Sequence, residues 1–321
     1  MKKSICLLFL IVNILFFTVA CMASPDSAAP RPNYDENFQS PSNPSGSSQF
    51  KPSPYSAFRF EWNEEYNGYF VYENDNNIYT NLVIPEAYYG KPVVGIGKYA
   101  FGSYSKLQSI VIPKSVRIIE ANAFNYCDYL VQVLFDGESS LCEIKENAFF
   151  NCKSIISITV PASVEFIGIN AFSTCPLLEK IDVHMNNEVY CSVDGSLYSK
   201  DLKTLIATPP AIRGTSFEVP YGVEIIEDGA FFNSDNILNI TIPKSVNSLG
   251  KNVFGKHLKE INYGGTCEEW NLLNGIVSED NAPSAPGGES TVNPGGSEKP
   301  EESIDYGYVV NCTDGTINTA R

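Results

Sequence analysis

Basic residues are scarce in this chain. Its 321 residues contain 22 Lys and Arg against 37 Asp and Glu, which gives a formal net charge of -15. Outside the first residues there is no run of Lys or Arg, and binding to a phosphate backbone depends on such residues to displace counterions. We therefore expect no nucleic-acid partner.

Histidine is nearly absent, and the residue patterns of common catalytic and metal sites are missing. His184 and His257 are the only two histidines, and neither lies in an H-E-x-x-H motif or pairs with a recognisable nucleophile, so both are interpreted as turn residues. The acidic pairs Glu64-Glu65 and Glu268-Glu269 define no glycosidase geometry. None of the nine Cys falls in C-x-x-C spacing. The sequence thus predicts a non-enzymatic protein with no catalytic residue, no metal and no cofactor.

The first residues resemble an export signal. Lys2 and Lys3 precede an apolar run from Ile5 to Phe17, which is short for a membrane span. The stretch Thr18 to Cys21 resembles a bacterial lipobox, although Thr18 stands where Leu is usual. We expect lipidation at Cys21 and a lipid-anchored place in the cell envelope or at the cell surface. Ordinary cleavage, giving a secreted protein, and a retained membrane helix remain open.

The dipeptide Ala-Phe recurs at a nearly constant distance. The pairs begin at residues 100, 123, 148, 171 and 230, with Val253-Phe254 as a variant, so the gaps are 23, 25, 23, 59 and 23 residues. A period in the low twenties is typical of a leucine-rich-repeat solenoid, in which each turn stacks on the previous one. We expect the Phe rings to form a continuous internal column.

Each repeat also carries a short strand of the pattern L-x-x-I-x-I-P. The segment LQSIVIP begins at Leu107, IISITVP at Ile155 and ILNITIP at Ile237. Alternate apolar positions face the core, and Pro ends the strand because it cannot donate a backbone hydrogen bond. The predicted fold is therefore a leucine-rich-repeat solenoid of mainly short parallel β-strands, with a period of about 23 residues and turns or short 3-10 pieces on its convex side.

Taken together, the repeats resemble the BspA-type leucine-rich repeats of bacterial cell-surface proteins. The pattern IP-x-S-V-x-x-I-x-x-x-A-F-x-x-C-x-x-L-x-x-I covers roughly residues 58–274 plus the ending Cys312-Thr313-Asp314-Gly315. SVDGSLYSKDLKTLIATPP at 192–210 resembles the hairpin insertion of this family, and INYGGTCEEWNLL at 261–273 resembles its C-terminal cap. The resemblance implies a surface protein that adheres to matrix and plasma glycoproteins.

Composition and resemblance together predict five segments. Two of them are rich in Pro, Ser and other polar residues and too poor in aliphatic residues to fold. The segments are a signal peptide with a lipobox-like end at 1–21, a disordered tether at 22–54, a repeat domain at 55–274 with a hairpin insertion at 184–215, a disordered acidic loop at 275–305, and a cap strand and tail at 306–321.

The Cys residues of the repeats and the cap have different interpretations. Cys127, Cys152 and Cys175 each follow a repeat Phe by three residues, so we expect a column of buried thiols that pack like small apolar groups. A disulfide within this column and a metal site are less favoured, because Tyr104 and Ser234 take the same position elsewhere. A Cys267–Cys312 bridge across the cap remains open.

The outward positions of the repeat strands are the candidate binding site, here called the strand face. They are small, mixed and mostly uncharged, with an apolar patch expected at Val111 and Leu134, and a flat sheet of this kind suits an extended ligand better than a catalytic pocket does. The two rows are Ser109, Gln132, Ser157, Lys180, Asn239 and Glu260, and Val111, Leu134, Thr159, Asp182, Thr241 and Asn262.

Two hypotheses of function follow from this surface. The first is a cell-surface binding or adhesion module whose partner is an extracellular protein or glycan, from the host matrix or a neighbouring cell, with membrane contact only through the N-terminal lipid. The second is an envelope scaffold that holds other surface components of the same cell. A merely solvated sheet face remains the plain alternative to both.

Overall fold

The computed structural model describes residues 50–74, 78–276 and 308–319. The described residues all belong to one compact unit. The expected signal peptide with Cys21, nearly all of the expected tether and the acidic loop from 277 onward lie outside the described residues, so these segments stay predictions. Among the described residues, no helix is long and apolar enough to cross a membrane.

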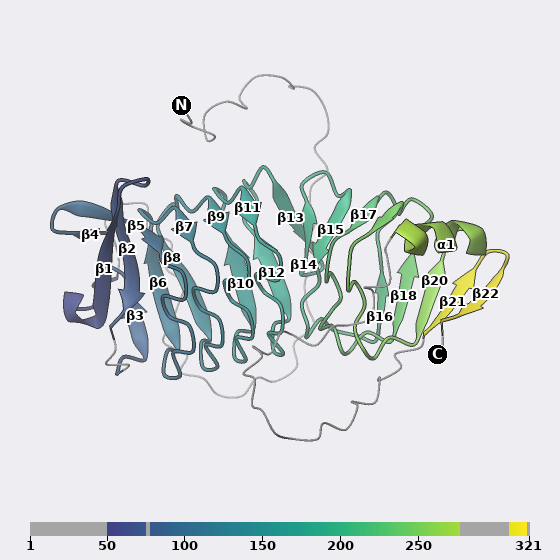
Figure 1. Cartoon of the computed structure of the whole chain (residues 1–321), viewed down its shortest axis with the longest axis horizontal. Coiled ribbons are helices and arrows are strands. Elements are labelled where there is room, and N and C mark those ends of the chain that lie inside the picture. Colours follow the sequence, from purple (N-terminus) through teal and green to yellow (C-terminus); the bar gives the residue numbers. More distant parts are fainter. Residues whose placement is uncertain (1–49, 75–77, 277–307, 320–321) are drawn as a thin grey trace, which may run out of the picture. The chain divides into compact units, whose positions relative to one another are not determined.

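The strands predicted from the L-x-x-I-x-I-P pattern form the first of two ladders, seen as the row of arrows in Figure 1. They pair in parallel and in register within three separate sheets, until the antiparallel strand β22 closes the last one. The sheets are β3(Asn81–Val83), β6(Ser109–Pro113) and β8(Gln132–Asp136); β10(Ser157–Val160) and β12(Lys180–Val183); and β16(Ser216–Glu218), β18(Asn239–Ile242), β20(Glu260–Tyr263), β21(Val309–Cys312) and β22(Gly315–Asn318).

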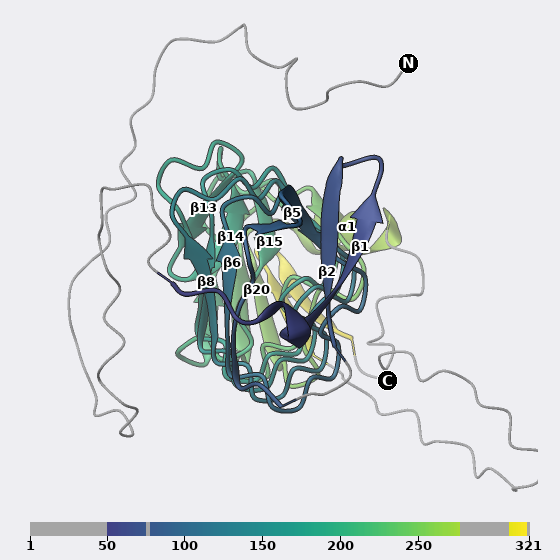
Figure 2. The same cartoon turned by 90° about the vertical axis from the view of Figure 1, so that its left-hand side faces the viewer.

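A second ladder runs along the other side of each turn, and the strands that the repeats contribute to it, such as β7 and β17, are only two residues long. Figure 2, which looks along the stack from the β1 end, shows the successive turns one behind another. One sheet holds β1(Phe58–Asn63), β2(Gly68–Glu73), β4(Ala87–Tyr88), β5(Lys91–Ile96), β7(Ile118–Ile119), β9(Glu143–Ile144) and β11(Phe166–Ile167). The other holds β13(Tyr190–Val193), β14(Ser196–Ser199), β15(Thr204–Ala207), β17(Ile225–Ile226) and β19(Ser248–Leu249).

Helices are rare in the described part of the chain. A 3-10 helix, η1(Tyr55–Ala57), precedes β1, and α1(Cys267–Ile276) follows β20 at the C-terminal end of the stack. The helix begins with a capping box: the Thr266 amide donates to Glu269 Oε2 at 2.9 Å and the Glu269 amide donates to Thr266 Oγ1 at 3.2 Å. The predicted solenoid of short parallel strands with a 23-residue period is confirmed.

The repeat Phe rings stack inside the solenoid, as predicted, but the column is not continuous. Phe101, Phe124, Phe149 and Phe172 follow one another at centroid distances of 5.2, 5.0 and 5.9 Å. Among the described residues, no stacked ring follows Phe172, and the next repeat ring, Phe231, meets Phe217 edge-on at 5.0 Å. The expectation of one unbroken column is therefore wrong, because the chain between these turns forms a hairpin instead of another repeat.

That hairpin, β13 with β14, lies between two hydrophobic cores. The side chains alternate along its strands: Tyr190 and Leu197 belong to the core of the preceding turns, whereas Cys191 and Tyr198 belong to the core of the following turns. Both faces of the hairpin are thus buried, as the period of two in a β-strand allows. The hairpin is a shared wall that joins two half-solenoids.

Each repeat turn also requires a left-handed backbone residue just before its Ala-Phe or Val-Phe pair. Asn122, Asn147, Asn170 and Asn252 have φ between 51° and 60°, and Gly229 has φ 68° at the same position. Asn and Gly tolerate this region better than other residues do. The preference explains why Asn recurs at a position whose side chain adds nothing to the core.

Candidate binding face

The register of the first ladder brings the predicted strand face together. Ser109 lies beside Gln132, Ser157 beside Lys180, and Asn239 beside Glu260. The second row follows in the same way through Val111 with Leu134, Thr159 with Asp182, and Thr241 with Asn262. Because the neighbouring core positions, such as Ile110, Ile158 and Ile240, are almost fully buried, these side chains project from the opposite side of the sheet.

The apolar patch expected on this face is not open to solvent. Val111 is only 4% exposed although it belongs to neither core cluster that contains Ile110 or Ile240, and Leu134 is half-buried. The exposed members of the face are polar: Gln132, Ser157, Thr159, Lys180 and Thr241. The expectation of an exposed Val-Leu contact is corrected accordingly, and ligand contacts on this face fall to polar side chains.

The strand face extends beyond the residues that sequence reasoning selected. Strand β3 adds Asn81 and Val83 ahead of Ser109, and β16 adds Ser216 and Glu218 ahead of Asn239. Both strands carry the same signal as the others, an apolar residue followed by Pro, in Ile84-Pro85 and Val219-Pro220. Ser216 precedes Asn239 by 23 residues, so β16 keeps the period, but Gly214 stands where the pattern has its first Leu or Ile and the full pattern does not mark the strand.

Polar contacts organise the two ends of the face. Near its start, Ser109 Oγ donates to Asn81 Oδ1 at 2.6 Å. Near its end, the side-chain amide of Asn311 on β21 bridges two acceptors, Glu260 and, at 3.0 Å, Asn262 Oδ1. The bridge fixes the rotamers of three side chains on adjacent strands, so this end of the face is preorganised for a ligand.

In the middle of the face, Lys180 Nζ lies 2.7 Å from Asp182 Oδ2 on the same strand, with both side chains about half exposed. An exposed ion pair of this kind contributes little to stability, on the order of 0–1 kcal/mol. The pair places a positive and a negative group side by side on the two-stranded sheet of β10 and β12, whose other residues are uncharged. A ligand is thus offered both signs of charge here at low desolvation cost.

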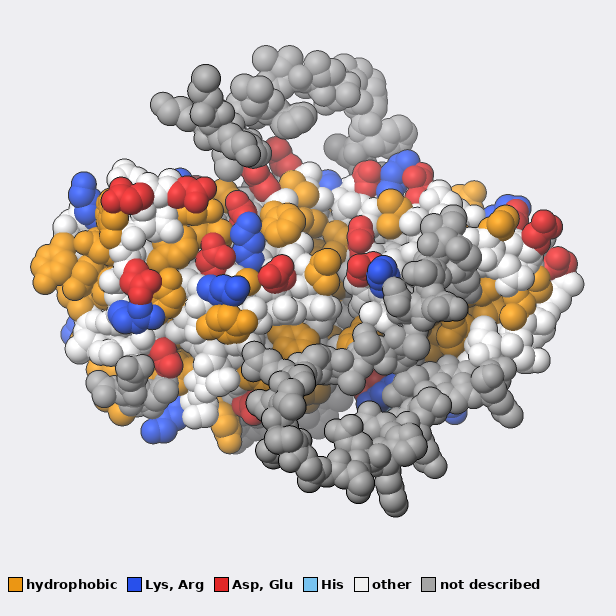
Figure 3. All heavy atoms as spheres, viewed as in Figure 1, with side chains coloured by type: hydrophobic (Ala, Val, Ile, Leu, Met, Phe, Trp, Pro, Cys, Tyr) orange, Lys and Arg blue, Asp and Glu red, His pale blue; other side chains and the backbone are white. Residues whose placement is uncertain are grey.

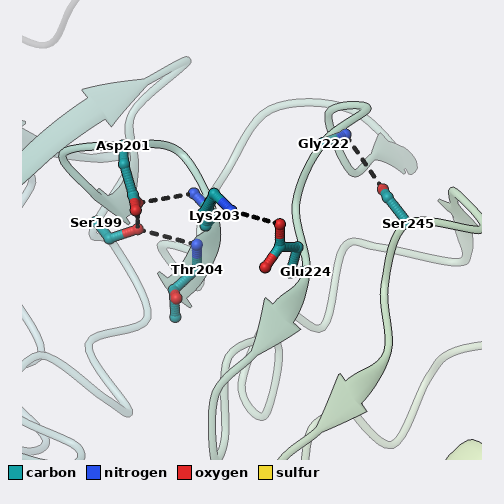
Figure 4. Close-up of polar contacts among 7 residues, drawn as sticks. All are labelled: Ser199, Asp201, Lys203, Thr204, Gly222, Glu224 and Ser245. Atoms are coloured by element: carbon teal, nitrogen blue, oxygen red, sulfur yellow. Dashed lines mark hydrogen bonds and ion pairs between the residues drawn. The ribbon is translucent and has the colours of Figure 1, made fainter.

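The turn between β14 and β15 is held by a separate polar cluster, shown in Figure 4. Asp201 Oδ1 accepts from Ser199 Oγ at 2.7 Å and from the Lys203 amide at 3.1 Å, and these hydrogen bonds lower the pKa of the Asp201 carboxyl. Lys203 Nζ in turn lies 2.6 Å from Glu224 Oε1 in the next turn. The cluster ties the hairpin to the second half-solenoid.

The three repeat cysteines form the expected column of buried thiols. Cys127, Cys152 and Cys175 each donate from Sγ to the carbonyl oxygen of a Phe in the preceding turn, at 3.0 to 3.1 Å. Burial raises the pKa of Cys127 to about 12 and that of Cys152 well above its ordinary value. Both thiols are therefore protonated and unreactive at neutral pH.

The cap brings together Cys267 and Cys312, which the sequence analysis had paired, and adds Asp314 beside them. The Sγ atoms of Cys267 and Cys312 and a carboxylate oxygen of Asp314 lie within 4.8 Å of one another, and both thiols are free. The Cys267 amide donates to Asp314 Oδ1 at 2.8 Å, so the carboxylate already serves the first turn of α1. Burial, then the neighbouring Cys267, raises the pKa of Cys312 to about 12. A Cys267–Cys312 bridge remains open.

The two histidines lie apart. His184 follows β12, where its Nδ1 accepts from the Asn186 amide at 3.2 Å, and His257 is exposed in the turn before β20. The fully buried side chain in this region is Asn187, whose amide donates to the carbonyls of Pro161 and Val164 at 2.9 Å. Asn187 is a structural link between turns that the sequence pattern did not reveal.

A cluster of aromatic side chains covers the β1 end of the stack, at the left of the space-filling view in Figure 3. Phe60 and Tyr88 stack at 4.0 Å with nearly parallel rings, and Tyr69 lies edge-on to both. Tyr89 is 83% exposed, and Tyr55 is also exposed. The cluster closes the first core and adds an apolar surface outside the strand face.

The architecture defines a leucine-rich-repeat solenoid, and its strand face runs along the first ladder from β3 to β21. The family model for the BspA type leucine rich repeat region matches six copies over residues 93–208 and 212–271, more than half of the chain. This protein belongs to the BspA-type leucine-rich-repeat family.

Several solved structures are similar to the chain. They include the pneumococcal vaccine antigen PcpA, at 24% identity over 58% of this chain with a TM-score of 0.46, and a leucine rich cell surface protein from Faecalibacterium prausnitzii A2-165, at 23% identity over 68% of this chain and 76% of that one with a TM-score of 0.39. This chain spans 62% of the length of the pneumococcal structure. No curated protein matches it.

Proposed function

We propose that this protein is a non-enzymatic binding module of the bacterial cell surface, which recognises an extracellular protein or glycan through the strand face. The observation that carries the proposal is the in-register array of exposed polar side chains along the first ladder, from β6 to β20. Stacked repeats offer such an array to an extended ligand, whereas a small substrate needs a pocket with converging groups. Membership of the BspA-type family agrees with a role in protein binding or adhesion.

The proposal includes export and a lipid anchor at Cys21. Its support is the sequence itself: two lysines, an apolar run and a lipobox-like end, followed by polar residues that suit a tether. Metabolic labelling with an alkyne fatty acid tests the anchor. The wild-type chain should take up the label and the Cys21→Ala variant should not; equal labelling of both would disprove lipidation at this residue.

Binding of the purified chain to immobilised matrix glycoproteins, plasma proteins and glycans tests the function. A Thr159→Glu/Thr241→Glu variant adds bulk and negative charge at two exposed positions of the strand face. Tyr221→Glu, at a turn residue that is 91% exposed, is the matched control. We expect saturable binding that the double variant weakens at least tenfold and the control retains.

The second candidate is an envelope scaffold, which the preorganised Glu260–Asn262–Asn311 end of the face favours, since a fixed polar cluster suits one permanent partner. Under this alternative the panel gives no binding, and cross-linking in cells recovers envelope proteins of the same bacterium. Equal binding by the wild type and the double variant would instead contradict the strand face as the site.

A further inference from the structure

The solenoid is held together along its Phe side by a ladder of backbone hydrogen bonds between turns. The amide of each repeat Phe donates to the carbonyl of Ala in the next turn: Phe101 to Ala123, Phe124 to Ala148 and Phe149 to Ala171, each at 2.8 Å. The residue two positions before each Phe does the same, as Asn122 donates to Glu146 and Asn147 to Ile169, both at 3.1 Å. These amides all point along the stack toward its C-terminal end.

This ladder stops at the turn that ends the first half-solenoid. Asn170 and Phe172 hold the same two positions there, and their amides have no acceptor among the residues that the structure describes. The next segment along the stack contains Thr208, and its hydrogen-bonding groups point away from these two amides. Both the amide and Oγ1 of Thr208 are used on the far side, where they donate to the Ala230 carbonyl at 2.8 and 2.6 Å. Two donors are thus left open inside the stack.

A cavity of about 240 Å³ lies at this junction. Its first wall is the turn that contains Asn170 and Phe172, and its opposite wall comes from the turn of the second half-solenoid and the strand β15. The hairpin and strand β12 supply apolar side chains between the two walls. The lining residues that matter here are Ile181, Leu197, Ala207, Glu227, Asp228 and Asn233.

The polar groups of the cavity are of two kinds. Donors come from the Asn170 and Phe172 amides and from Asn233, whose Nδ2 is buried without a hydrogen-bond partner. A buried donor without an acceptor costs roughly 1–3 kcal/mol, so this one favours an occupant that supplies an acceptor. Acceptors come from the exposed carboxylates of Glu227 and Asp228, and Asp228 gives one of its oxygens to the Lys251 amide at 2.7 Å.

The occupant must therefore accept hydrogen bonds from amides, donate them to carboxylates and present carbon to an apolar wall. Hydroxyl groups both donate and accept, and a sugar ring carries several of them around faces made of C–H bonds. An anion is repelled by the two carboxylates, and a bare cation gains nothing from amide donors. We propose that the junction cavity binds a neutral monosaccharide unit, either free or at the end of a glycan.

This second site does not depend on the strand face. Strand-face variants leave the cavity intact, and a ligand that fills the cavity does not touch residues such as Thr159 or Thr241. Failure of one proposal therefore leaves the other standing, and the experiments separate them.

The test is titration of the purified full chain with free galactose, N-acetylglucosamine and fucose, with sialic acid as the anionic counterpart and N-acetyl-Ala-Ala-amide as a peptide probe. Calorimetry measures binding, and hydrogen–deuterium exchange locates it. We expect at least one neutral sugar to bind with saturation and to slow exchange at residues 169–174. Exchange at 122–126, where the same amides already have partners, should not change.

Two variants test the cavity, one by filling it and the other by removing a hydrogen-bond donor from its wall. Ala207→Phe fills it, and Asn233→Leu removes the side-chain donor while keeping a similar volume. Ala162→Phe adds the same bulk at an exposed position outside the cavity and is the control. Both cavity variants should lose at least tenfold in affinity, with the melting temperature of the sugar-free protein measured in parallel to identify unfolding.

Three results would overturn the proposal. They are the absence of any neutral sugar that slows exchange at 169–174, protection of these amides by the peptide probe or sialic acid alone, and unchanged sugar affinity in Asn233→Leu together with Ala207→Phe. Because the first two use only the wild-type chain, they hold even if a variant fails to fold.

Discussion

Phe124 lies in the middle of the buried Phe column. Its ring is fully buried and lies between Phe101 and Phe149, nearly parallel to both. Phe124→Ala should lower the free energy of unfolding by about 3–5 kcal/mol, because the cavity that it leaves adds to the lost burial. Urea denaturation measures the change. Phe166→Ala, at a ring that is 47% exposed, should cost less than about 1 kcal/mol; similar costs at both positions would contradict the buried column.

Asn147 has a backbone role instead. Its φ of 55° lies in the left-handed region, which costs an ordinary L-residue about 1–2 kcal/mol. Asn147→Val should therefore destabilise the chain by that amount, whereas Asn147→Gly should be nearly neutral because Gly adopts positive φ without strain. The two unfolding free energies, measured side by side, decide the point. A Gly variant as unstable as the Val variant would show that the Asn side chain itself matters.

At the residue scale, the sequence pattern predicted the buried positions that recur from repeat to repeat, and it missed features that occur at a single position. Ala-Phe spacing located the Phe column and the thiol column, since both depend on a periodic pattern of apolar residues. The burial of Val111 could not be predicted, because alternation along a strand says which side a residue faces and nothing of what covers that side. Asn187 was missed for a related reason, since its buried hydrogen bonds join segments of different turns.

Among the elements, α1 depends most visibly on one local device, the Thr266–Glu269 capping box. Thr266→Ala should destabilise the cap by about 1 kcal/mol, since an N-cap hydroxyl is lost. Lys244, followed by the Thr266 amide, lowers the pKa of the Glu269 carboxyl. A lowered folded-state pKa stabilises the fold above the ordinary carboxyl range, and this stabilisation disappears as the pH falls through the folded pKa.

Glu269→Gln should accordingly be less stable than the wild type at pH 7, and the difference should disappear as the pH falls through the folded-state pKa of Glu269. Trp270, fully buried in α1, reports on the cap by its fluorescence when Trp62, the other Trp, is replaced by Phe. Urea titrations at several pH values give the comparison. A stability difference that persists unchanged at low pH would contradict the ionised Glu269 cap.

Element prediction succeeded for strands that carry the full L-x-x-I-x-I-P pattern, such as β6, β10 and β18, and it was weaker on the other side of the turn. The second ladder consists of strands such as β7 and β17 that are only two residues long, too short for alternation to be recognised. The strand β16 escaped notice because Gly214 and Phe217 stand where β6 and β18 have Leu or Ile, although it lies 23 residues before β18. In both cases, too few residues carry the strand pattern for the strand to be recognised from the sequence.

At the scale of the whole molecule, the hairpin β13–β14 couples two half-solenoids. Leu197 packs in the first core and Tyr198 in the second, and both are nearly fully buried. Calorimetry of the wild type should show one cooperative transition, because a repeat array unfolds as a unit only when its internal interfaces are strong. Leu197→Ala/Tyr198→Ala should split this transition into two. Two transitions in the wild type would show that the halves are independent.

The strand face is the proposed place where a macromolecule binds this protein. A photoreactive amino acid at Thr159 or Thr241, in the full chain on intact cells, tests this most directly, with the same amino acid at Tyr221 as the control. We predict adducts with an extracellular protein or glycan from both face positions and none from the control. Adducts from Tyr221 alone, or none from either face position under conditions where the cells bind ligand, would contradict the account.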